Sequence, residues 1–507
     1  MEEVQANKKP WIVLLPIGIA ALILAIDDGI LNLALPAIAD EFEASTSQLQ
    51  WAYNAYLLAF AALMLTMGAL GDRLGRKRLF QGGIILFGIS SLAAALSTSM
   101  VMLIASRAVM GVAGAVALPQ TLSIIRASFT DPDDRAKAIG IWAGIFGLGY
   151  GIGPVVGGVF LEYFEWYSVF LINIPISIIA FIGGYFYISE SSDQNAPRLD
   201  PVGVILSIAA LFSVVYGIIK AGEESWTHSS VIIWLSIGAV LLMVFVLWEK
   251  RSSHPLLPMR FFRNMSFTGP NISMTLAAFS VFSILWFVSQ YFQSVQGYSA
   301  LAAAIRLIPT AIIILITASL GSTVARAAGI KLPVSLGMLI CGFGFFYLSF
   351  LEADTSYIVV VGGLLLMGGG YGLAWTPSTD SIMGSVPESR AGIGSAMDQT
   401  TQFVGGILGV AALGAITNGI YRDRVEDMRA ILTLPDEMHS TIESGIQSAH
   451  IVAREFPQDT SQLIITETRE AFTSGMTEAM FVAGIVLVAA SLVTLFILPN
   501  RIRPSEE

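Results

Sequence analysis

Apolar residues fill most of this chain in stretches long enough to cross a hydrocarbon core, which takes about 20 residues in an α-helix. Their approximate limits, fourteen stretches in all, are 11–36, 49–71, 79–97, 100–126, 136–160, 166–188, 201–220, 229–248, 267–290, 302–325, 332–351, 356–386, 391–420 and 475–498. A lipid-embedded backbone must satisfy its hydrogen bonds internally, and a helix does this within one segment. The pattern therefore predicts an all-α membrane protein with fourteen transmembrane helices.

The turns between these stretches differ in charge, and the difference predicts an orientation. With the N-terminus placed in the cytoplasm, Lys and Arg gather in the cytoplasmic turns, as at 73–78 and 250–263, and the short outer turns almost lack them. We therefore expect both termini in the cytoplasm and the chain in the cytoplasmic membrane. The first stretch is too long for a cleaved signal peptide and contains Asp27 and Asp28.

The order of the stretches predicts three parts. Residues 1–199 would form a six-helix bundle, residues 200–265 an extra two-helix hairpin, and residues 266–507 a second six-helix bundle. The last part contains a long outer loop, 421–474, with helical periodicity in segments such as SQLIITETREAF. This loop is either an ordered lid over the outer surface or a solvated insertion without a role in transport.

The composition excludes several classes of function. Of 507 residues, 55% are hydrophobic and 13% charged, whereas soluble domains carry about 25% charged residues. The net charge of −10 argues against a nucleic acid partner. Cys341 is the single cysteine, and the sequence has no phosphate-binding loop, nucleophile elbow or metal-spaced histidines. We expect neither an enzyme nor a bound metal or organic cofactor.

The turn after the second stretch reads GALGDRLGRKRL and carries an acid among four cations. It resembles the signature loop of the major facilitator superfamily, which implies that superfamily's fold, with a gating role for this loop. The residues that we assign to it are Gly68, Asp72, Arg73, Gly75 and Arg76. The resemblance implies that Asp72 pairs with a nearby cation, for which we expect Arg135; the alternative for Arg135 is simple positive-inside anchoring.

The fifth stretch contains GYGIGPVVGG, which is similar to the antiporter motif of exporters in the same superfamily. Glycines four residues apart leave a smooth helix face for close contact, and a proline bends the helix. The residues of this motif are Gly149, Gly153, Pro154, Gly157 and Gly158. The bland alternative is ordinary packing of small residues.

The first stretch reads IDDGILNLALP, which resembles the first-helix motif of the fourteen-helix drug:proton antiporters of the EmrB/QacA group. Asp27, Asn32 and Pro36 match that motif, while Gly29 stands where threonine is usual and Asp28 is an additional acid. Similar segments occur over nearly the whole chain. The resemblance implies two six-helix bundles plus an extra helix pair.

Few ionisable residues lie at membrane depth, where they are costly and functional. Asp27 and Asp28 point about 100° apart on a helix, so both cannot face the cavity squarely. We favour Asp27 as the cavity acid because it holds the motif position. Arg107 is either the cation that keeps an acid ionised or part of a static pair. Asp398 and Gln402, four residues apart, share one helix face and make the thirteenth stretch a candidate cavity wall.

These features predict a secondary transporter that alternates access to a site near the bilayer midplane. The resemblance implies a proton-coupled exporter of lipophilic, cationic drugs, driven by the proton gradient alone and acting as a monomer on small amphiphilic substrates in the bilayer. Export of an anionic metabolite, siderophore or tetracycline-like compound is the alternative. A channel and a non-transporting sensor are further alternatives with less support.

Overall fold

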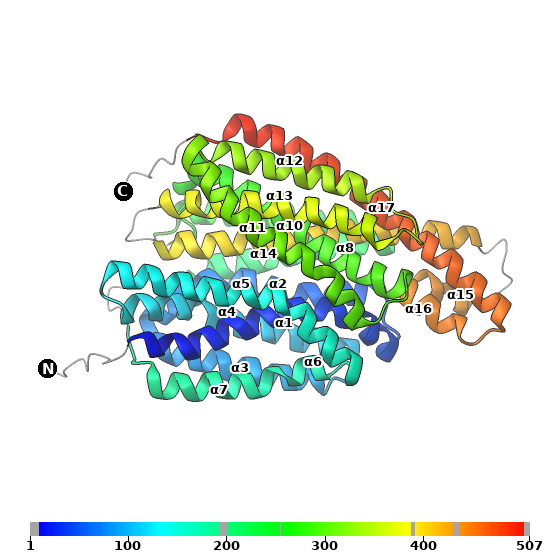
Figure 1. The fold of residues 1–507 in the computed structure, drawn as a ribbon, viewed down its shortest axis with the longest axis horizontal. Coiled ribbons are helices and arrows are strands. Elements are labelled where there is room, and N and C mark those ends of the chain that lie inside the picture. Colours follow the sequence, from blue (N-terminus) through cyan, green and yellow to red (C-terminus); the bar gives the residue numbers. More distant parts are fainter. Residues whose placement is uncertain (1–9, 193–199, 254, 387–390, 429–434, 501–507) are drawn as a thin grey trace.

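The computed structural model describes residues 10–192, 200–253, 255–386, 391–428 and 435–500, and every described element is a helix. Figure 1 shows the helices running side by side along the long axis of the molecule. Thirteen of the described helices are long and apolar enough to cross a membrane. Helix α2, bent by 54° between Met64 and Thr66, makes the fourteenth. The expected fourteen apolar helices are therefore present.

The first group of helices packs together as an N-terminal half. It comprises α1 (Leu14–Phe42), α2 (Thr46–Leu74), α3 (Arg76–Ala95), α4 (Met100–Ser128), α5 (Pro132–Tyr163), the short α6 (Ser168–Leu171) and α7 (Asn173–Tyr187), preceded by a 3-10 turn at Pro10–Val13. Several starts are set by local capping, as where Ser45 and Gln48 form a capping box before α2. Between α2 and α3, Gly75 has a φ of 112°, which allows one residue to end one helix and begin the next.

The second group packs together as a C-terminal half. Its long helices are α10 (Met265–Gln290), α11 (Ala300–Ala328), α12 (Lys331–Leu348), α13 (Tyr357–Gly384), α14 (Ala391–Met428) and α17 (Gln458–Ile497), with a 3-10 turn at Phe261–Arg263 and a π-helical turn at Tyr291–Val295. The start of α1 and the end of α17 lie at the same end of the molecule (Figure 1), which we call the terminal end.

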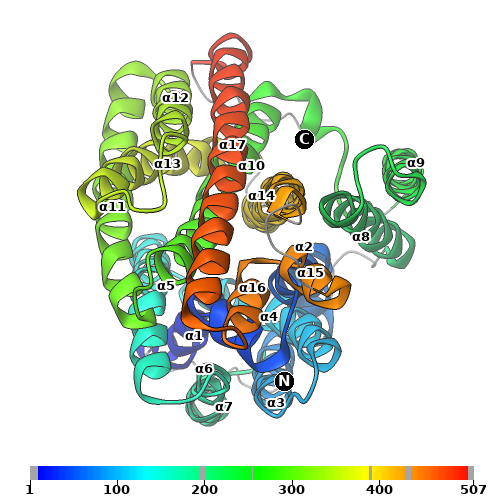
Figure 2. The ribbon, with the colours of Figure 1, turned by 90° about the vertical axis from the view of Figure 1, so that its right-hand side faces the viewer.

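An extra helix pair, α8 (Pro201–Glu223) and α9 (Ser229–Arg251), lies beside the seam between α2 and α14, as Figure 2 shows. Helix α8 contacts both halves. The ring of Trp51 on α2 lies 5.6 Å from that of Phe212, and Asn418 on α14 donates a hydrogen bond to the carbonyl of Gly222 at 3.0 Å. The pair therefore bridges the two halves on one side.

The long loop expected at 421–474 is largely helical. Helix α14 continues to Met428, α15 (Asp436–Glu443) and α16 (Ile446–Ala453) follow, and α17 begins at Gln458, well before the predicted start at 475. The amphipathic segment extends α17 outward because its apolar side chains pack against α16 instead of ending at the membrane. We call α15, α16 and residues 458–474 the helical cap, which covers the end opposite the terminal end (Figure 1).

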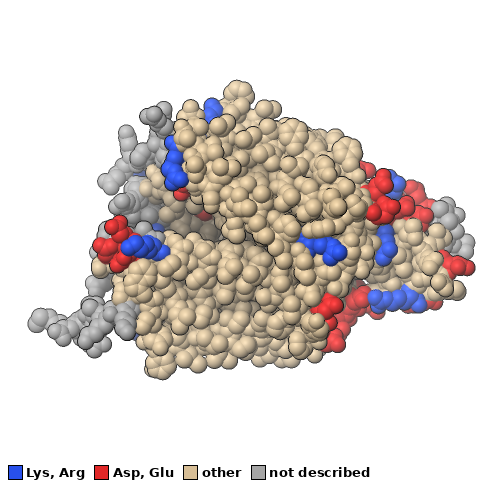
Figure 3. Space-filling model, in the orientation of Figure 1, with Lys and Arg blue, Asp and Glu red and all other residues tan. Residues whose placement is uncertain are grey.

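The two halves touch at the cap end and separate at the terminal end. Near the cap, Ser289 on α10 donates a hydrogen bond to the Asn32 carbonyl on α1 at 2.8 Å, and a Cβ at Gly158 would lie 2.9 Å from Ala304 on α11. At the terminal end of α5, a Cβ at Gly140 or Gly144 would meet no other atom within 4 Å. Figure 3 shows a hollow between the halves there. The structure is thus closed beneath the cap and open at the terminal end.

Candidate translocation site

Asp27 on α1 and Arg107 on α4 form an ion pair inside the N-terminal half. Arg107 Nη1 lies 2.6 Å from Asp27 Oδ2, and neither side chain is more than 3% exposed. Asn173 on α7 donates a hydrogen bond to the other carboxylate oxygen at 2.8 Å. The Arg107 guanidinium also lies 4.3 Å from the centre of the Tyr56 ring. Asp27, favoured above as the cavity acid, is therefore neutralised and held on both oxygens.

Asp28 has a different environment although it is the next residue. It is 3% exposed, and its Oδ1 is buried without a hydrogen-bond partner. The hydroxyl of Tyr150 on α5 lies beside its carboxyl, and Tyr53 and Tyr56 on α2 lie within electrostatic reach. Arg107 lies within the same reach but bonds to Asp27. Asp28 is thus a buried acid without a bonded cation.

The antiporter motif brings α5 against this part of α1. A Cβ at Gly149 would lie 2.9 Å from the Leu22 carbonyl, one at Gly153 3.0 Å from the Ile26 carbonyl, and one at Gly157 3.0 Å from the Ile30 side chain. These three glycines therefore face α1, and their close packing positions Tyr150 at Asp28. Pro154 packs on Gly29, where a Cβ would lie only 3.1 Å from its ring. A threonine at position 29 would consequently crowd Pro154.

Gly158 faces the other half instead. Its backbone packs against Leu301 and Ala304 on α11, so the last glycine of the motif belongs to the contact between halves, whereas the others belong to the contact between α5 and α1.

An aromatic row runs along α5 from the terminal end toward Asp28. Trp142 and Phe146 are stacked at 5.4 Å with an angle of 7° between ring planes, and Phe146 meets Tyr150 edge-on at 5.3 Å. The spacing of four residues along one helix is the signal of this row in the sequence. The row ends at the Asp28 carboxyl.

A second buried acid lies in the C-terminal half. Asp398 on α14 accepts hydrogen bonds from Thr379 Oγ1 at 3.0 Å and from Gln402 Nε2 at 3.2 Å. The hydroxyl of Tyr371 donates to Gln402 Oε1 at 3.3 Å, and the Tyr371 ring lies 5.4 Å from that of Trp375. Asp398 and Gln402 do share one face of α14, but this acid has neutral donors and no bonded cation.

The signature loop at the terminal end is held by local contacts. Asp72 pairs with Arg76, whose Nη2 lies 2.8 Å away, rather than with the expected Arg135. The pair forms because the sharp turn at Gly75 brings Arg76, the first residue of α3, back to Asp72 near the end of α2. Arg126 lies within electrostatic reach of the same carboxylate and of Arg135. Glu190 accepts hydrogen bonds from the backbone of Lys77 and Arg78 and so caps α3.

Comparison with known proteins decides the family. The model of the Major Facilitator Superfamily matches residues 17–410. The chain belongs to this superfamily. The chain is thus a multi-pass membrane protein, and its family consists of small-molecule transporters.

Relatives of the chain within the superfamily are efflux and resistance proteins. The multidrug efflux pump LfrA of Mycolicibacterium smegmatis is 34% identical over 488 residues, covering 96% of this chain and 95% of the relative. The tetracenomycin C resistance and export protein of Streptomyces glaucescens is 31% identical, covering 96% and 91%. The methyl viologen resistance protein SmvA of Salmonella typhimurium is 29% identical, covering 95% and 96%.

A solved structure shows the same fold. A bacterial homologue of the human lysosomal transporter Spinster, in an inward-facing and unoccupied conformation, superposes with a TM-score of 0.68 at 15% identity. The match covers 97% of this chain and 98% of the other.

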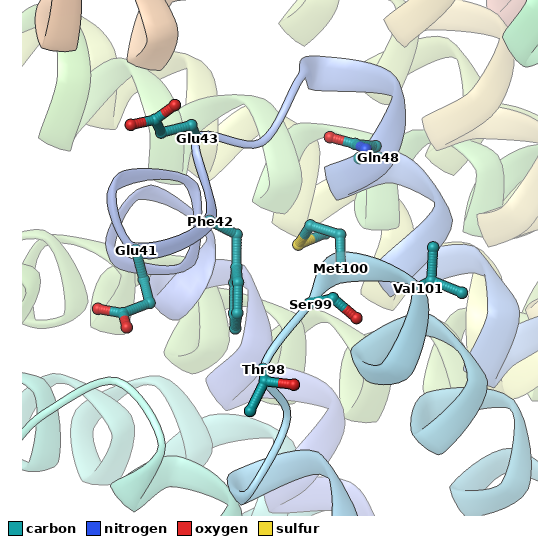
Figure 4. Close-up of a pocket in the computed structure, with 8 residues that line it drawn as sticks. All are labelled: Glu41, Phe42, Glu43, Gln48, Thr98, Ser99, Met100 and Val101. Atoms are coloured by element: carbon teal, nitrogen blue, oxygen red, sulfur yellow. The ribbon is translucent and has the colours of Figure 1, made fainter.

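The surface also has an open pocket at the cap end, drawn in Figure 4, with a volume of about 440 Å³. Glu41, Phe42 and Glu43 at the end of α1 and Ser99 to Val101 at the start of α4 line it. It lies about 20 Å along α1 from Asp28, at 1.5 Å per residue. It is therefore separate from the buried acids Asp27 and Asp28.

Two residues of this site escaped sequence analysis. Asn173, which bonds Asp27, is a polar residue in the otherwise apolar segment VFLINIPI, and that contrast is the signal that could have found it. Ser91 on α3 accepts a hydrogen bond from the same amide and donates one to the Phe170 carbonyl. Nothing in the sequence around Ser91 distinguishes it from other small residues of α3.

Proposed function

We propose that this chain is a proton-coupled antiporter that exports flat, lipophilic cations across the cytoplasmic membrane, with Asp28 as the coupling acid. One observation carries the proposal: two buried carboxyls, Asp27 and Asp28, adjoin a single guanidinium, and Asp27 is bonded to it. With both acids ionised the cluster has a net charge of −1. Burying an uncompensated charge is costly, so either a proton or a substrate cation must neutralise Asp28.

Competition between proton and cation for one carboxylate is sufficient for antiport. A cation that reaches Asp28 from the open terminal end displaces the proton, and a proton arriving from the cap end later displaces the cation. Exchange of one proton for one monovalent cation moves no net charge, so the pH difference drives this cycle and supplies about 1.4 kcal/mol per pH unit. This cycle places the terminal end in the cytoplasm, in agreement with the expected orientation of both termini.

The aromatic row on α5 supports a flat cation as substrate. Ring faces attract cations when water is excluded, and Trp142, Phe146 and Tyr150 lead toward Asp28. Two relatives are named for multidrug efflux and for methyl viologen resistance. Asp398 and Gln402 would contact the substrate from the C-terminal half. Export of an anion is less favoured because Asp27 already neutralises Arg107.

The signature loop serves in this proposal as a gate at the terminal end. Asp72 pairs with Arg76 and lies within electrostatic reach of Arg126, and these interactions would rearrange as the halves rock. The protein would work as a monomer, with the proton gradient as its energy source.

The experiment that tests this function is ethidium transport in proteoliposomes with an imposed pH gradient. Wild type should accumulate the dye and dissipate the gradient, while Asp28→Asn should do neither. The variant should also bind the dye more weakly than wild type does. Asp380→Asn is the matched control, since Asp380 is an exposed acid near the terminal end of α13. If Asp28→Asn transports ethidium with the same proton dependence as wild type, Asp28 is not the coupling acid.

A further inference from the structure

Two arginines near the cap end of the C-terminal half have no acidic partner. Arg306 on α11 donates Nη1 to the Ala302 carbonyl at 2.9 Å, while its Nε is buried without a partner. The Nε of Arg469 on α17 is also buried without a partner. In the part of the chain that the structure describes, neither arginine forms an ion pair. Both keep donors available for an anion.

The two arginines flank the turn that precedes α11. The Arg306 guanidinium lies 3.8 Å from the centre of the Tyr298 ring and 5.4 Å from that of Tyr357. Arg469 Nη2 lies 3.9 Å from the place of a Cβ on Gly297, the residue before Tyr298. The tyrosine rings fix the guanidinium plane of Arg306 and attract its charge, but they leave its edge free to donate hydrogen bonds.

This place lies at the membrane boundary. Arg306 is six residues into α11, about 9 Å from the start of the helix at 1.5 Å per residue. The side chains of Ile305 and Ile312 on the same helix are about half exposed, so this surface of α11 faces lipid. Figure 3 shows basic atoms exposed within an otherwise uncharged surface over α11. The first N–H groups of α11 add positive potential at this end.

We propose that Arg306 and Arg469 bind the phosphate group of a phospholipid in the leaflet at the cap end. The planar fork of an arginine matches the oxygens of a phosphate. The exposed isoleucines beside Arg306 offer an apolar surface for the acyl chains, which a free phosphate ion would not use. The lipid would thus supply the counter-charge that the protein does not provide.

The test measures the thermal stability of the full chain in mild detergent during titration with dioctanoyl phosphatidylglycerol. Dioctanoylglycerol, which lacks phosphate, and inorganic phosphate are the two comparison probes. The variants are Arg306→Gln, Arg469→Gln and the double variant. Arg454→Gln is the matched control, because Arg454 is an exposed arginine at the cap end that pairs with Asp40. Native mass spectrometry counts the lipid retained by each purified protein.

Phosphatidylglycerol should raise the melting temperature of wild type and of Arg454→Gln. Each single variant should need about ten times more lipid for the same rise, and the double variant should retain no specific lipid. An equal rise with inorganic phosphate alone, or with dioctanoylglycerol, would overturn the proposal, as would unchanged lipid retention in the double variant. If Arg306→Gln does not fold, Arg306→Lys replaces it, because lysine keeps the charge but loses the planar fork, and it should weaken lipid binding in the same way. Arg469→Gln then serves as the second, independent measurement.

Discussion

Replacing Asp27 by asparagine tests whether one guanidinium serves two acids. The substitution keeps the side-chain shape but removes the negative charge that lies 2.6 Å from the fully buried Arg107. Removing one partner of a buried ion pair generally costs about 3–5 kcal/mol of unfolding free energy, because the other charge is left uncompensated. Here Asp28 has a free oxygen near the same guanidinium. It should take over part of that role.

The expected losses of stability therefore depend on which acids remain. Asp28→Asn should cost less than about 1 kcal/mol, since the Asp28 carboxyl has no bonded cation to lose. Asp27→Asn should cost an intermediate amount, and the double variant should lose the full amount of about 3–5 kcal/mol. The two substitutions are thus expected to be non-additive, as neighbours that share a partner are.

The assay is reversible unfolding of purified protein in mixed micelles of increasing SDS content at pH 7.5. Arg107→Met in the Asp27→Asn background serves as the rescue, because removing both members of a buried pair costs far less than removing one. A double variant, Asp27→Asn with Asp28→Asn, that is as stable as wild type would refute the reasoning. So would strictly additive losses for the two single variants.

Three further predictions concern helix packing, the cap and the signature loop. Gly153→Ala should reduce transport at least tenfold, because the added Cβ would lie 3.0 Å from the Ile26 carbonyl and push Tyr150 away from Asp28. Gly144→Ala is the control and should leave transport rates unchanged, because no other atom lies within 4 Å of its Cβ. Burial lowers the pKa of His450 to about 4, and the nearby charge of Arg469 adds to this effect. His450 therefore binds a proton near pH 6.5 in the unfolded chain but only near pH 4 in the folded cap. The unfolding free energy should therefore fall by up to about 3 kcal/mol between pH 7 and 4, which a lower melting temperature would report. A His450→Gln variant with the same fall would contradict this. Asp72→Asn should insert normally and lose most ethidium transport, and full activity in a proteoliposome assay would remove Asp72 from the gate.

The long helices were predictable because each contains an apolar stretch of about the 20 residues that a hydrocarbon core requires. The boundary of α17 was not, since an amphipathic segment that packs on a neighbour continues a helix beyond the membrane. The partner of Asp72 was not predicted either. The positive φ of Gly75 produces a turn that brings Arg76 back to Asp72, and the sequence does not show the direction of that turn.

The division of roles between Asp27 and Asp28 could not be read from the sequence. Helix geometry states that adjacent residues point about 100° apart, but it does not state what lies in either direction. Arg107 comes from α4, Asn173 from α7 and Tyr150 from α5, so the environments of the two acids are fixed by three long-range contacts. A motif position identifies an important acid, and only the packing of the helices shows which of two neighbours is already neutralised.

The helical cap sets an energetic condition on any opening at its end. It is joined by the chain to α14 and α17, so it moves with the C-terminal half, and its contacts to the N-terminal half must break when the halves part there. Those contacts include a backbone hydrogen bond from Thr46 to the Ser444 carbonyl at 2.9 Å and an exposed ion pair between Arg454 and Asp40. A hydrogen bond contributes about 1 kcal/mol and an exposed ion pair less than that. Each of these polar contacts is therefore weak enough to break and re-form once in every transport cycle.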